Sequence, residues 1–283
     1  MMLVQSQKYN WKALLARLIE YAGLAALAAV FIVPFLWMLS TSLKSYEQSM
    51  QFPPTLIPTP VVWENFPYVW EQYNLLGYLK NSVLVVVIIM VFQILLVVPT
   101  AYAFATKEFK GKKFFFSLVI FGFMVPTEVT FVPVYLLFSK VGFINTYMAL
   151  TIPFFFSAFG TFLFAQTFRQ IPRELLESAS LDGASEVTKI FRIMLPMAKS
   201  TFVSFLLFSL VAHWNDYFWT MVMTYTPDVR TIPCAVANIL NSGEMKNWSH
   251  IMAANVIMML PMLVAYCFSN KHIKTALAYG GIK

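Results

Sequence analysis

Long apolar runs are the feature that most limits what this chain can fold into. A helix needs roughly 20 apolar residues to cross a bilayer. Six stretches reach about that length, and they cover residues 18–41, 79–106, 114–138, 147–168, 201–224 and 250–270. The runs are continuously apolar, whereas the strands of a membrane β-barrel alternate. The sequence therefore predicts an all-α polytopic membrane protein with six transmembrane helices.

The charge of the chain supports this interpretation. Only 12% of the residues are charged, whereas a soluble globular domain carries about 25%. The net charge of +7 could suggest a nucleic-acid partner, but 15 of the 20 Lys and Arg residues fall in connections on one side of the six runs. The positive-inside rule places that side, with both termini, in the cytoplasm. The excess of Lys and Arg therefore reflects the orientation of the chain in the membrane, and we expect no nucleic-acid partner.

The longest polar interval between apolar runs, residues 169–200, predicts a cytoplasmic hairpin of two short helices. Asp182-Gly183 would break the first helix, because Gly allows positive φ and Asp can cap the helix that follows. Pro196 would end or bend the second helix. Apolar side chains at helical spacing give that helix a single stripe, formed by Val187, Ile190, Phe191, Met194 and Leu195.

Small residues recur in this hairpin, at Ser178, Ala179, Gly183 and Ala184. One interpretation is an amphipathic hairpin that lies on the lipid surface. The other is a helix that inserts into a groove of a partner protein. A lipid-facing helix would favour bulky side chains, whereas small residues let another surface approach the backbone, so the second interpretation is favoured.

The run Glu177-Ser-Ala-x-x-Asp182-Gly183-Ala, followed by Phe191-x-Ile193-x-Leu195-Pro196, resembles the EAA coupling motif of binding-protein-dependent ABC importer permeases. The family has Ala where this chain has Ser178. The rest of the chain from about residue 78 resembles the carbohydrate-uptake branch, akin to the smaller maltose-type permease subunit. The Pro126-Thr-Glu128-Val segment also resembles glycerol-3-phosphate permeases.

The resemblance implies a type I importer permease (MetI-like) fold. Residues 78–283 would form the core transmembrane domain, with the coupling hairpin at 169–200, and residues 1–77 match the family only in layout. The residues that would couple to an ATPase are Glu177, Ser178, Ala179, Asp182, Gly183, Ala184, Phe191, Leu195 and Pro196.

The partners that the resemblance implies are a second homologous permease, two ABC ATPase subunits and an extracytoplasmic solute-binding protein, in a bacterial or archaeal plasma membrane. The sequence contains no G-x-x-x-x-G-K-[ST] phosphate loop. ATP and Mg²⁺ would therefore be used by the partner, and this chain is expected to bind no cofactor and not to be an enzyme. The basic tail, residues 271–283, is either a frayed end or, by resemblance, a segment that reaches between the two ATPases.

Polar residues inside the apolar runs are candidates for the substrate pathway. An ionisable group inside a span costs about 2.5–3.5 kcal/mol on insertion scales, so it usually faces protein or water. Carboxylates, amides and aromatic faces together suit sugar hydroxyls. The alternative is that the Asn and Trp side chains only join helices. The candidates are Glu128, Trp214, Asn215, Asp216 and Tyr217.

The predicted function is a permease subunit of an ATP-driven ABC importer for a carbohydrate or related solute, which works by alternating access. Glycerol-3-phosphate, a polyamine or another small solute is the alternative cargo. A membrane enzyme or assembly factor that uses the hairpin as an anchor is an alternative from another class, but the sequence shows no convergent set of catalytic groups. Cys234 and Cys267 match no metal or redox spacing and are expected to be unpaired.

Overall fold

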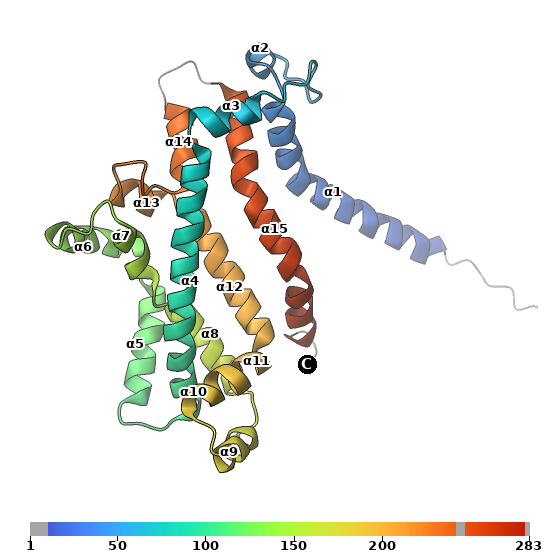
Figure 1. Cartoon of the computed structure of the whole chain (residues 1–283). Coiled ribbons are helices and arrows are strands. Elements are labelled where there is room, and N and C mark those ends of the chain that lie inside the picture. Colours follow the sequence, from blue (N-terminus) through green and yellow to red (C-terminus); the bar gives the residue numbers. More distant parts are fainter. Residues whose placement is uncertain (1–10, 242–246, 281–283) are drawn as a thin grey trace, which may run out of the picture. The chain divides into compact units, whose positions relative to one another are not determined.

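A computed structural model describes residues 11–241 and 247–280 (Figure 1). These residues form helices and connections, without a strand among them. The chain divides into two compact units, Met1–Val69 with Gly243–Val256 and Trp70–Ser242 with Ile257–Lys283. Helices α3 (Asn65–Gln72) and α15 (Trp248–Gly280) contribute residues to both units.

The first unit contains α1 (Trp11–Ser42) and the short helix α2 (Tyr46–Met50). Residues 51–64 form no helix, and they include Pro53, Pro54, Pro58 and Pro60, which disfavour helical structure. Lys44 is only 2% exposed in this region. Its ammonium group donates to the carbonyl of Thr55 and lies 4.5 Å from the centre of the Trp37 ring. The amide of Asn65 donates to the carbonyls of Ser42 and Lys44, both at 2.9 Å, so the end of α1 and the start of α3 are joined.

The second unit contains the remaining helices. They are α4 (Leu75–Thr106), α5 (Lys112–Met124), α6 (Thr127–Lys140), α7 (Tyr147–Thr151), η1 (Ile152–Phe154), α8 (Ala158–Phe168), α9 (Glu174–Leu181), α10 (Glu186–Thr188), the π-helical turn η2 (Lys189–Met194), α11 (Leu195–Met197), α12 (Lys199–Trp214), α13 (Phe218–Met223) and α14 (Ile232–Asn241).

The helices that are long and apolar enough to cross a membrane agree with the predicted spans. Within the described residues four helical segments qualify, and they are Leu15–Ser42, Leu75–Thr106, Tyr147–Phe168 and Trp248–Ser269. Two bent helix pairs also qualify when each pair is taken as one span, which brings the number to six. The prediction of an all-α multi-pass protein is confirmed.

The third predicted span, 114–138, is not one straight helix. It consists of α5 and α6, which meet at an angle of 98°. Val125 has an extended backbone at the break, with ψ of 119°. Proline disfavours helical geometry in the residue before it, and it has no N–H to donate, so Pro126 accounts for the break.

The fifth predicted span, 201–224, is also interrupted. Its helix α12 ends at Trp214, and the separate helix α13 begins at Phe218. The segment before it, Glu186–Met197, meets α12 at 87°. This bend follows Pro196, which the sequence predicts to end or bend the helix. The missing N–H of a proline interrupts the helical hydrogen bonds there.

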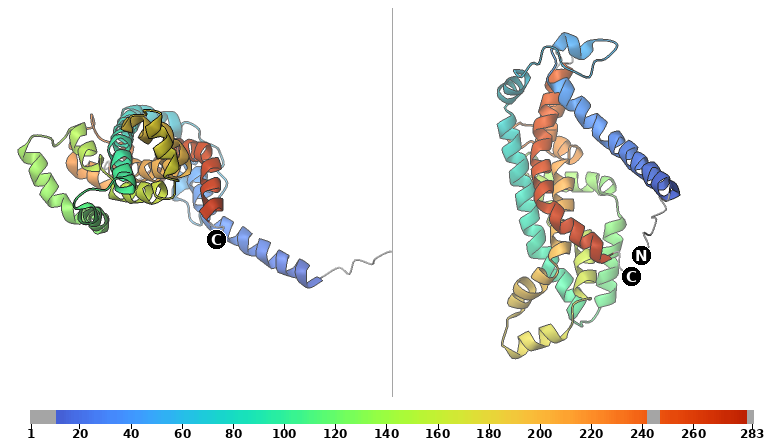
Figure 2. Two further views of the ribbon diagram at one scale, coloured as in Figure 1. Left: turned by 90° about the horizontal axis from the view of Figure 1, so that it is seen from below. Right: turned by 90° about the vertical axis from the view of Figure 1, so that its right-hand side faces the viewer.

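Helix α4 is the element against which the second unit is built. It packs along α8 and also contacts α12, α14 and α7. A core at its C-terminal half joins Ala101 and Tyr102 to Phe164 of α8 and Phe205 of α12. Gly160 allows this close approach, because a Cβ atom there would lie 2.4 Å from the Phe205 ring. Figures 1 and 2 show α9 protruding at the end of this unit, beyond the last turn of α4.

The last helix, α15, continues to Gly280. The predicted role of the basic tail falls partly outside the described residues, because residues 281–283 and the side chains beyond residue 269 are not described. Both cysteines are free, as predicted, with Cys234 buried and Cys267 exposed.

Candidate functional site

The turn of the hairpin has the hydrogen bonds of a Schellman motif. Gly183 has φ of +75°. Its N–H donates to the carbonyl of Ser180 at 3.1 Å, and the N–H of Ala184 donates to the carbonyl of Ala179 at 2.9 Å. A residue in this position must adopt the left-handed region, which Gly does at little cost. The predicted break at Asp182-Gly183 is confirmed.

The expected capping role of Asp182 is wrong. Asp182 ends α9, where its own N–H donates to the carbonyls of Ser178 and Ser180. The following helix is capped by Ser185, whose Oγ accepts from the N–H of Thr188 at 3.2 Å. An N-cap must directly precede the first helical residue. The glycine turn separates Asp182 from that position.

The second arm of the hairpin, residues 186–197, is anchored by apolar packing. Ile190 is 8% exposed and Met194 is fully buried. Phe191 and Leu195 are partly buried against the same core as the C-terminal half of α4. Val187 is 65% exposed, so four of the five residues of the predicted apolar stripe pack against the core and the fifth does not.

The predicted coupling residues divide into an outward and an inward set. Glu177, Ser178, Asp182, Gly183 and Pro196 are exposed. Ala179 is buried, and the partly buried ones are Ala184, Phe191 and Leu195. Phe191 and Leu195 therefore pack within this chain.

One further exposed residue, Leu181, was missed. It is 90% exposed at the end of α9. Its sequence position does not distinguish it from a core leucine. We call Glu177, Ser178, Leu181, Asp182 and Gly183 the docking surface, for the role that we propose for them.

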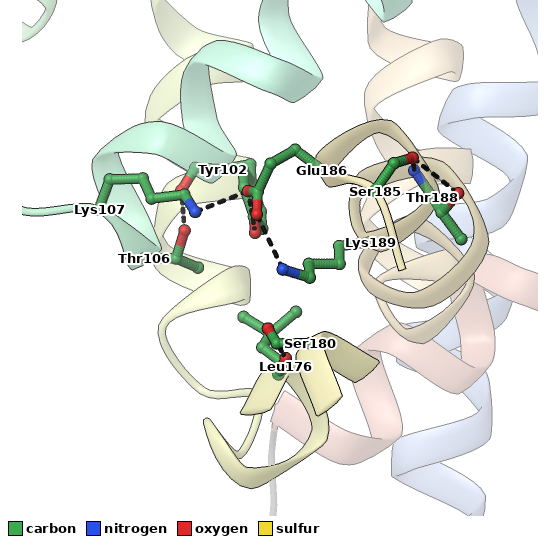
Figure 3. Close-up of polar contacts among 9 residues, drawn as sticks. All are labelled: Tyr102, Thr106, Lys107, Leu176, Ser180, Ser185, Glu186, Thr188 and Lys189. Carbon is green, nitrogen blue, oxygen red and sulfur yellow. Dashed lines mark hydrogen bonds and ion pairs between the residues drawn. The ribbon is translucent and has the colours of Figure 1, made fainter. Parts of the chain in front are cut away.

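The carboxylate of Glu186 joins the hairpin to α4 (Figure 3). It pairs with the Lys107 ammonium at 2.6 Å and the Lys189 ammonium at 2.8 Å, and it accepts from the Tyr102 hydroxyl at 2.9 Å. Tyr102 lies in the last turns of α4 and Lys107 directly follows that helix. We call these four residues the Glu186 clasp.

The clasp keeps Glu186 charged. The bonds from Lys107 and then Lys189 lower the pKa of the Glu186 carboxyl from 4.5 to about 2. The same contact raises the pKa of Lys107. Charge-assisted hydrogen bonds to the ionised form have this effect. Sequence reasoning missed the clasp, because 84 residues separate Tyr102 from Glu186 and no local spacing indicates their contact.

A cavity of about 210 Å³ separates α9 from the end of α4. It lies beneath the clasp, where Figure 3 shows Leu176 and Ser180 of α9 on the side facing Lys189. We call it the hairpin cavity. Its lining comprises Tyr102, Thr106, Lys107, Arg173, Leu176, Glu177, Ser180 and Lys189.

A second cavity, of about 360 Å³, brings together two of the predicted pathway residues. We call it the transport cavity, for the role that we propose for it. Glu128, from the start of α6, and Asp216, from the connection after α12, both line it. The other lining residues are Thr127, Phe154, Ala212, His213, Phe218 and Trp219. This lining contains two carboxylates and three aromatic rings, without a lysine or arginine.

The other three predicted pathway residues lie outside this lining. Trp214 is buried, and its indole N–H donates to the carbonyl of Met258 at 3.1 Å. The amide of Asn215 donates to the carbonyl of Val211 at 2.9 Å. Tyr217 is 39% exposed. The Trp214 bond joins α12 to α15, as the alternative interpretation expects, whereas the Asn215 bond stays within α12 and joins no second helix.

Asp216 has a structural contact as well as its place in the cavity. One of its carboxylate oxygens accepts from the N–H of Trp219 at 3.0 Å. This bond satisfies a backbone N–H in the first turn of α13, although the N-cap position itself is held by Tyr217. The carboxylate can still accept from a solute hydroxyl, because each ionised carboxylate offers about four acceptor positions.

Gln93 of α4 supports the wall of the transport cavity. Its amide donates to the carbonyl of Phe154 at 2.9 Å, and its oxygen accepts from the Ser209 hydroxyl at 2.6 Å. Its nitrogen also lies 3.5 Å from the His213 ring. Gln93 thereby connects α4 to η1 and α12. A glutamine inside an apolar run is unusual, and that signal could have identified it.

Comparison with known proteins agrees with this geometry. Residues 97–278 match the family described as "Binding-protein-dependent transport system inner membrane component". The AraQ permease protein of an arabinooligosaccharide transport system in Halalkalibacterium halodurans is 29% identical, with 92% of this chain and 94% of that protein covered. The UgpE permease protein of an sn-glycerol-3-phosphate transport system in Yersinia pestis is 30% identical, with 77% and 80% covered.

Two solved structures share the fold. A chain of a bacterial ABC transporter involved in the import of the acidic polysaccharide alginate superposes with a TM-score of 0.81, at 20% identity, over 94% of this chain and 99% of that one. A chain of a bacterial alginate ABC transporter in complex with its pentasaccharide-bound periplasmic protein gives a TM-score of 0.64, at 17% identity, over 93% and 96%. The permease fold that the sequence predicts is confirmed. The chain is a membrane transport component, and it belongs to the family of inner membrane components of binding-protein-dependent transport systems.

Proposed function

We propose that this chain is the permease subunit of an ATP-driven importer for a carbohydrate, and that its hairpin docks on a separate ATPase subunit. The observation that carries the docking role is the exposed end of α9. Small residues surround Leu181, which is 90% exposed, and the turn at Gly183 holds them in place. A partner groove can accept such a helix end, because small side chains let another surface approach the backbone closely.

ATP and Mg²⁺ would act in the partner, and the role of this chain is to change shape. ATP closes the ATPase dimer, the docking surface moves with it, and the permease alternates between inward-open and outward-open states. This coupling requires the ATPase to contact the hairpin differently in the two states. The Lys and Arg distribution supports a cytoplasmic hairpin and cytoplasmic termini.

The transport cavity favours a neutral polyhydroxylated solute. Its volume falls within the range of about 300–1,000 Å³ typical of small-molecule sites. The carboxylates of Glu128 and Asp216 can accept hydrogen bonds from sugar hydroxyls, and the faces of Phe218 and Trp219 provide apolar contact. The AraQ relative, from an arabinooligosaccharide system, agrees with a carbohydrate cargo.

Glycerol-3-phosphate is the second candidate cargo, because the UgpE relative belongs to a system for it. The lining of the transport cavity opposes this candidate. Two carboxylates without a neighbouring cation repel an anion in a site of low dielectric. A phosphate site usually contains Arg, Lys or a set of backbone N–H groups.

The proposed assembly contains this chain, a second homologous permease, two ATPases and an extracytoplasmic solute-binding protein. The alginate transporter chain that shares this fold was crystallised with its periplasmic protein, which supports the last of these partners.

The test is to purify the chain with its partners from its own host, identify them by mass spectrometry, and reconstitute the complex in proteoliposomes. The proposal predicts an ATPase with a phosphate loop and ATP-dependent uptake of radiolabelled arabinotriose but not of glycerol-3-phosphate. Uptake of glycerol-3-phosphate alone would overturn the carbohydrate assignment. A complex without an ATPase would overturn the whole proposal.

A further inference from the structure

The two arms of the hairpin are attached to the membrane helices very differently. The second arm is anchored by Ile190 and Met194, which are buried in the core of the second unit. In α9, Ala179 is the buried residue and Leu176 is partly buried against that core. The hairpin cavity of about 210 Å³ separates α9 from the end of α4. A force applied to α9 can therefore reach α4 around the turn, in addition to the route through α8, which packs along α4.

Glu186 is the first residue of the second arm, directly after that turn. Its bond to Lys189 stays within the arm, whereas its bonds to Tyr102 and Lys107 reach α4. Lys189 is 8% exposed, which fixes one side of the clasp. Each bond has a charged partner, and such bonds are short and directional. The carboxylate thus ties the moving end of the hairpin to the end of α4.

Helix α4 extends this connection through the second unit. Its 32 residues form one helix, with Gln93 bonded to the carbonyl of Phe154 and to Ser209 in the wall of the transport cavity. Near its other end, the amide of Asn81 donates to the carbonyls of Asp228 and Arg230 at 2.9 and 3.0 Å. Pro99 lies between Tyr102 and Gln93 and removes one helical hydrogen bond, but the helix continues through it, so a displacement of the last turn can be transmitted along α4.

We infer that Glu186 is a positioning residue that transmits the movement of the hairpin to α4 and, through Gln93, to the transport cavity. The inference rests on the proposed function, because it requires a hairpin moved by an ATPase. The transmission runs from the docking surface through the turn to Glu186, from Glu186 to Tyr102 and Lys107, and along α4 to Gln93.

If the clasp had a purely structural role, its loss would impair folding or ATPase binding. Lys107 and Glu186 are each 48% exposed at the side chain, and exposed ion pairs contribute about 0–1 kcal/mol to stability. The apolar packing of Ile190 and Met194 already holds the second arm in place. Loss of the clasp should then leave folding and ATPase binding intact. If the movement instead passed directly from the second arm into α12, loss of the clasp would leave transmission intact. The experiment must therefore distinguish transmission through the clasp from transmission through α12.

The experiment uses the complete complex in proteoliposomes, with a fluorophore on a cysteine placed at Leu96. Leu96 lies in α4 and is 43% exposed. Cys267 is replaced by Ser because it is exposed, whereas Cys234 is buried and stays. The readouts are ATPase co-purification, ATP hydrolysis and the fluorescence change on ATP addition. The matched control is Glu108→Gln, which breaks an exposed ion pair to Lys112 within one segment of the chain.

Glu186→Gln is expected to keep the ATPase bound. It should reduce the ATP-driven fluorescence change by at least about fivefold, which is the smallest factor expected from typical coupling free energies. Glu108→Gln should match the wild type. The full charge exchange, Glu186→Lys with Lys107→Glu and Lys189→Glu, should recover most of the signal, because both ion pairs are restored with opposite sign. A wild-type signal in Glu186→Gln, or an exchange as defective as its single variants, would overturn the inference.

If Glu186→Gln does not assemble, Tyr102→Phe decides, because it removes one hydroxyl and keeps the ring. A reduced signal in an assembled complex supports transmission through the clasp, and an unchanged signal refutes it. Failure of the proposed function has a separate signature. In that case the wild-type complex itself contains no ATPase or gives no response to ATP.

Discussion

The hydroxyl of Tyr102 donates a hydrogen bond of 2.9 Å to the carboxylate of Glu186, which lies 84 residues further along the chain. Tyr102 lies in the last turns of the membrane helix α4, and Glu186 is the first residue of the second arm of the hairpin. The contact links the part of the chain that would dock on a motor to the helix against which the second unit packs. In the proposed mechanism, this contact links the ATPase to the solute path.

Replacing Gly183 with Val should uncouple the transporter. Gly183 has φ of +75°, where an L-residue costs about 1–2 kcal/mol, and the bulk would also obstruct the docking surface. We expect an inserted protein with strongly reduced uptake and weaker ATPase co-purification. Gly142→Val is the matched control, because Gly142 has φ of +73° and open space around it, away from the hairpin. Wild-type uptake in Gly183→Val would remove the docking role from this turn.

The clasp should contribute to stability over most of the pH range. The folded-state pKa of Glu186 is lowered from 4.5 to about 2, so its contribution is present above about 4.5 and is lost as the pH falls toward about 2. Thermal unfolding of the purified protein should therefore show a small deficit for Glu186→Gln at neutral pH, of about 1 kcal/mol or less. The deficit should shrink below about pH 4.5. A deficit that grows with acidity would contradict this assignment.

Two substitutions of Asp216 separate its structural and pathway roles. The amide oxygen of Asn can accept from a first-turn N–H as Asp does, whereas Ala removes such a bond, and the loss of a bond of this kind costs about 1 kcal/mol. Asp216→Asn should keep the bond from the Trp219 N–H and the thermal stability, yet it should lower uptake by removing the carboxylate from the transport cavity. Asp216→Ala should lower both. Normal uptake in Asp216→Asn would make the residue purely structural.

Gly160→Ala should destabilise the second unit. A Cβ atom would lie 2.4 Å from the ring of Phe205, which is 2% exposed and cannot easily move. Overpacking of this kind costs about 1–3 kcal/mol. Gly122→Ala is the control, because nothing lies within 4 Å of its added Cβ. The thermal unfolding temperatures of the two variants in detergent provide the comparison, and equal temperatures would contradict the packing described for α8 and α12.

The sequence predicted the features that depend on local chemistry. Continuous apolar runs indicated the spans, and Asp182-Gly183 indicated the turn, because only a few residue types suit a left-handed backbone. The breaks within two spans were harder to see. Hydropathy does not register the break that Pro126 makes between α5 and α6, nor the end of α12 at Trp214.

The candidate site was only partly predictable, because much of it depends on contacts between distant segments. Glu128 and Asp216 stood out as ionisable residues in apolar runs, and the structure places both in one cavity. The bonds of Glu186 to Tyr102 and Lys107, and the exposure of Leu181, gave no local signal. The exposure of Leu181 and the pairing of Glu186 with Lys107 are determined by how the helices pack and not by spacing along the chain.

The central claim, that the hairpin docks on an ATPase, is tested most directly by site-specific photo-crosslinking in cells. A photoreactive residue at Leu181, which is 90% exposed, should form an adduct with a protein that carries a phosphate loop, identified by mass spectrometry. The same residue at Ile57, which is 72% exposed in the proline-rich loop, should not. The account is contradicted if position 181 gives no such adduct, or if position 57 gives the same one.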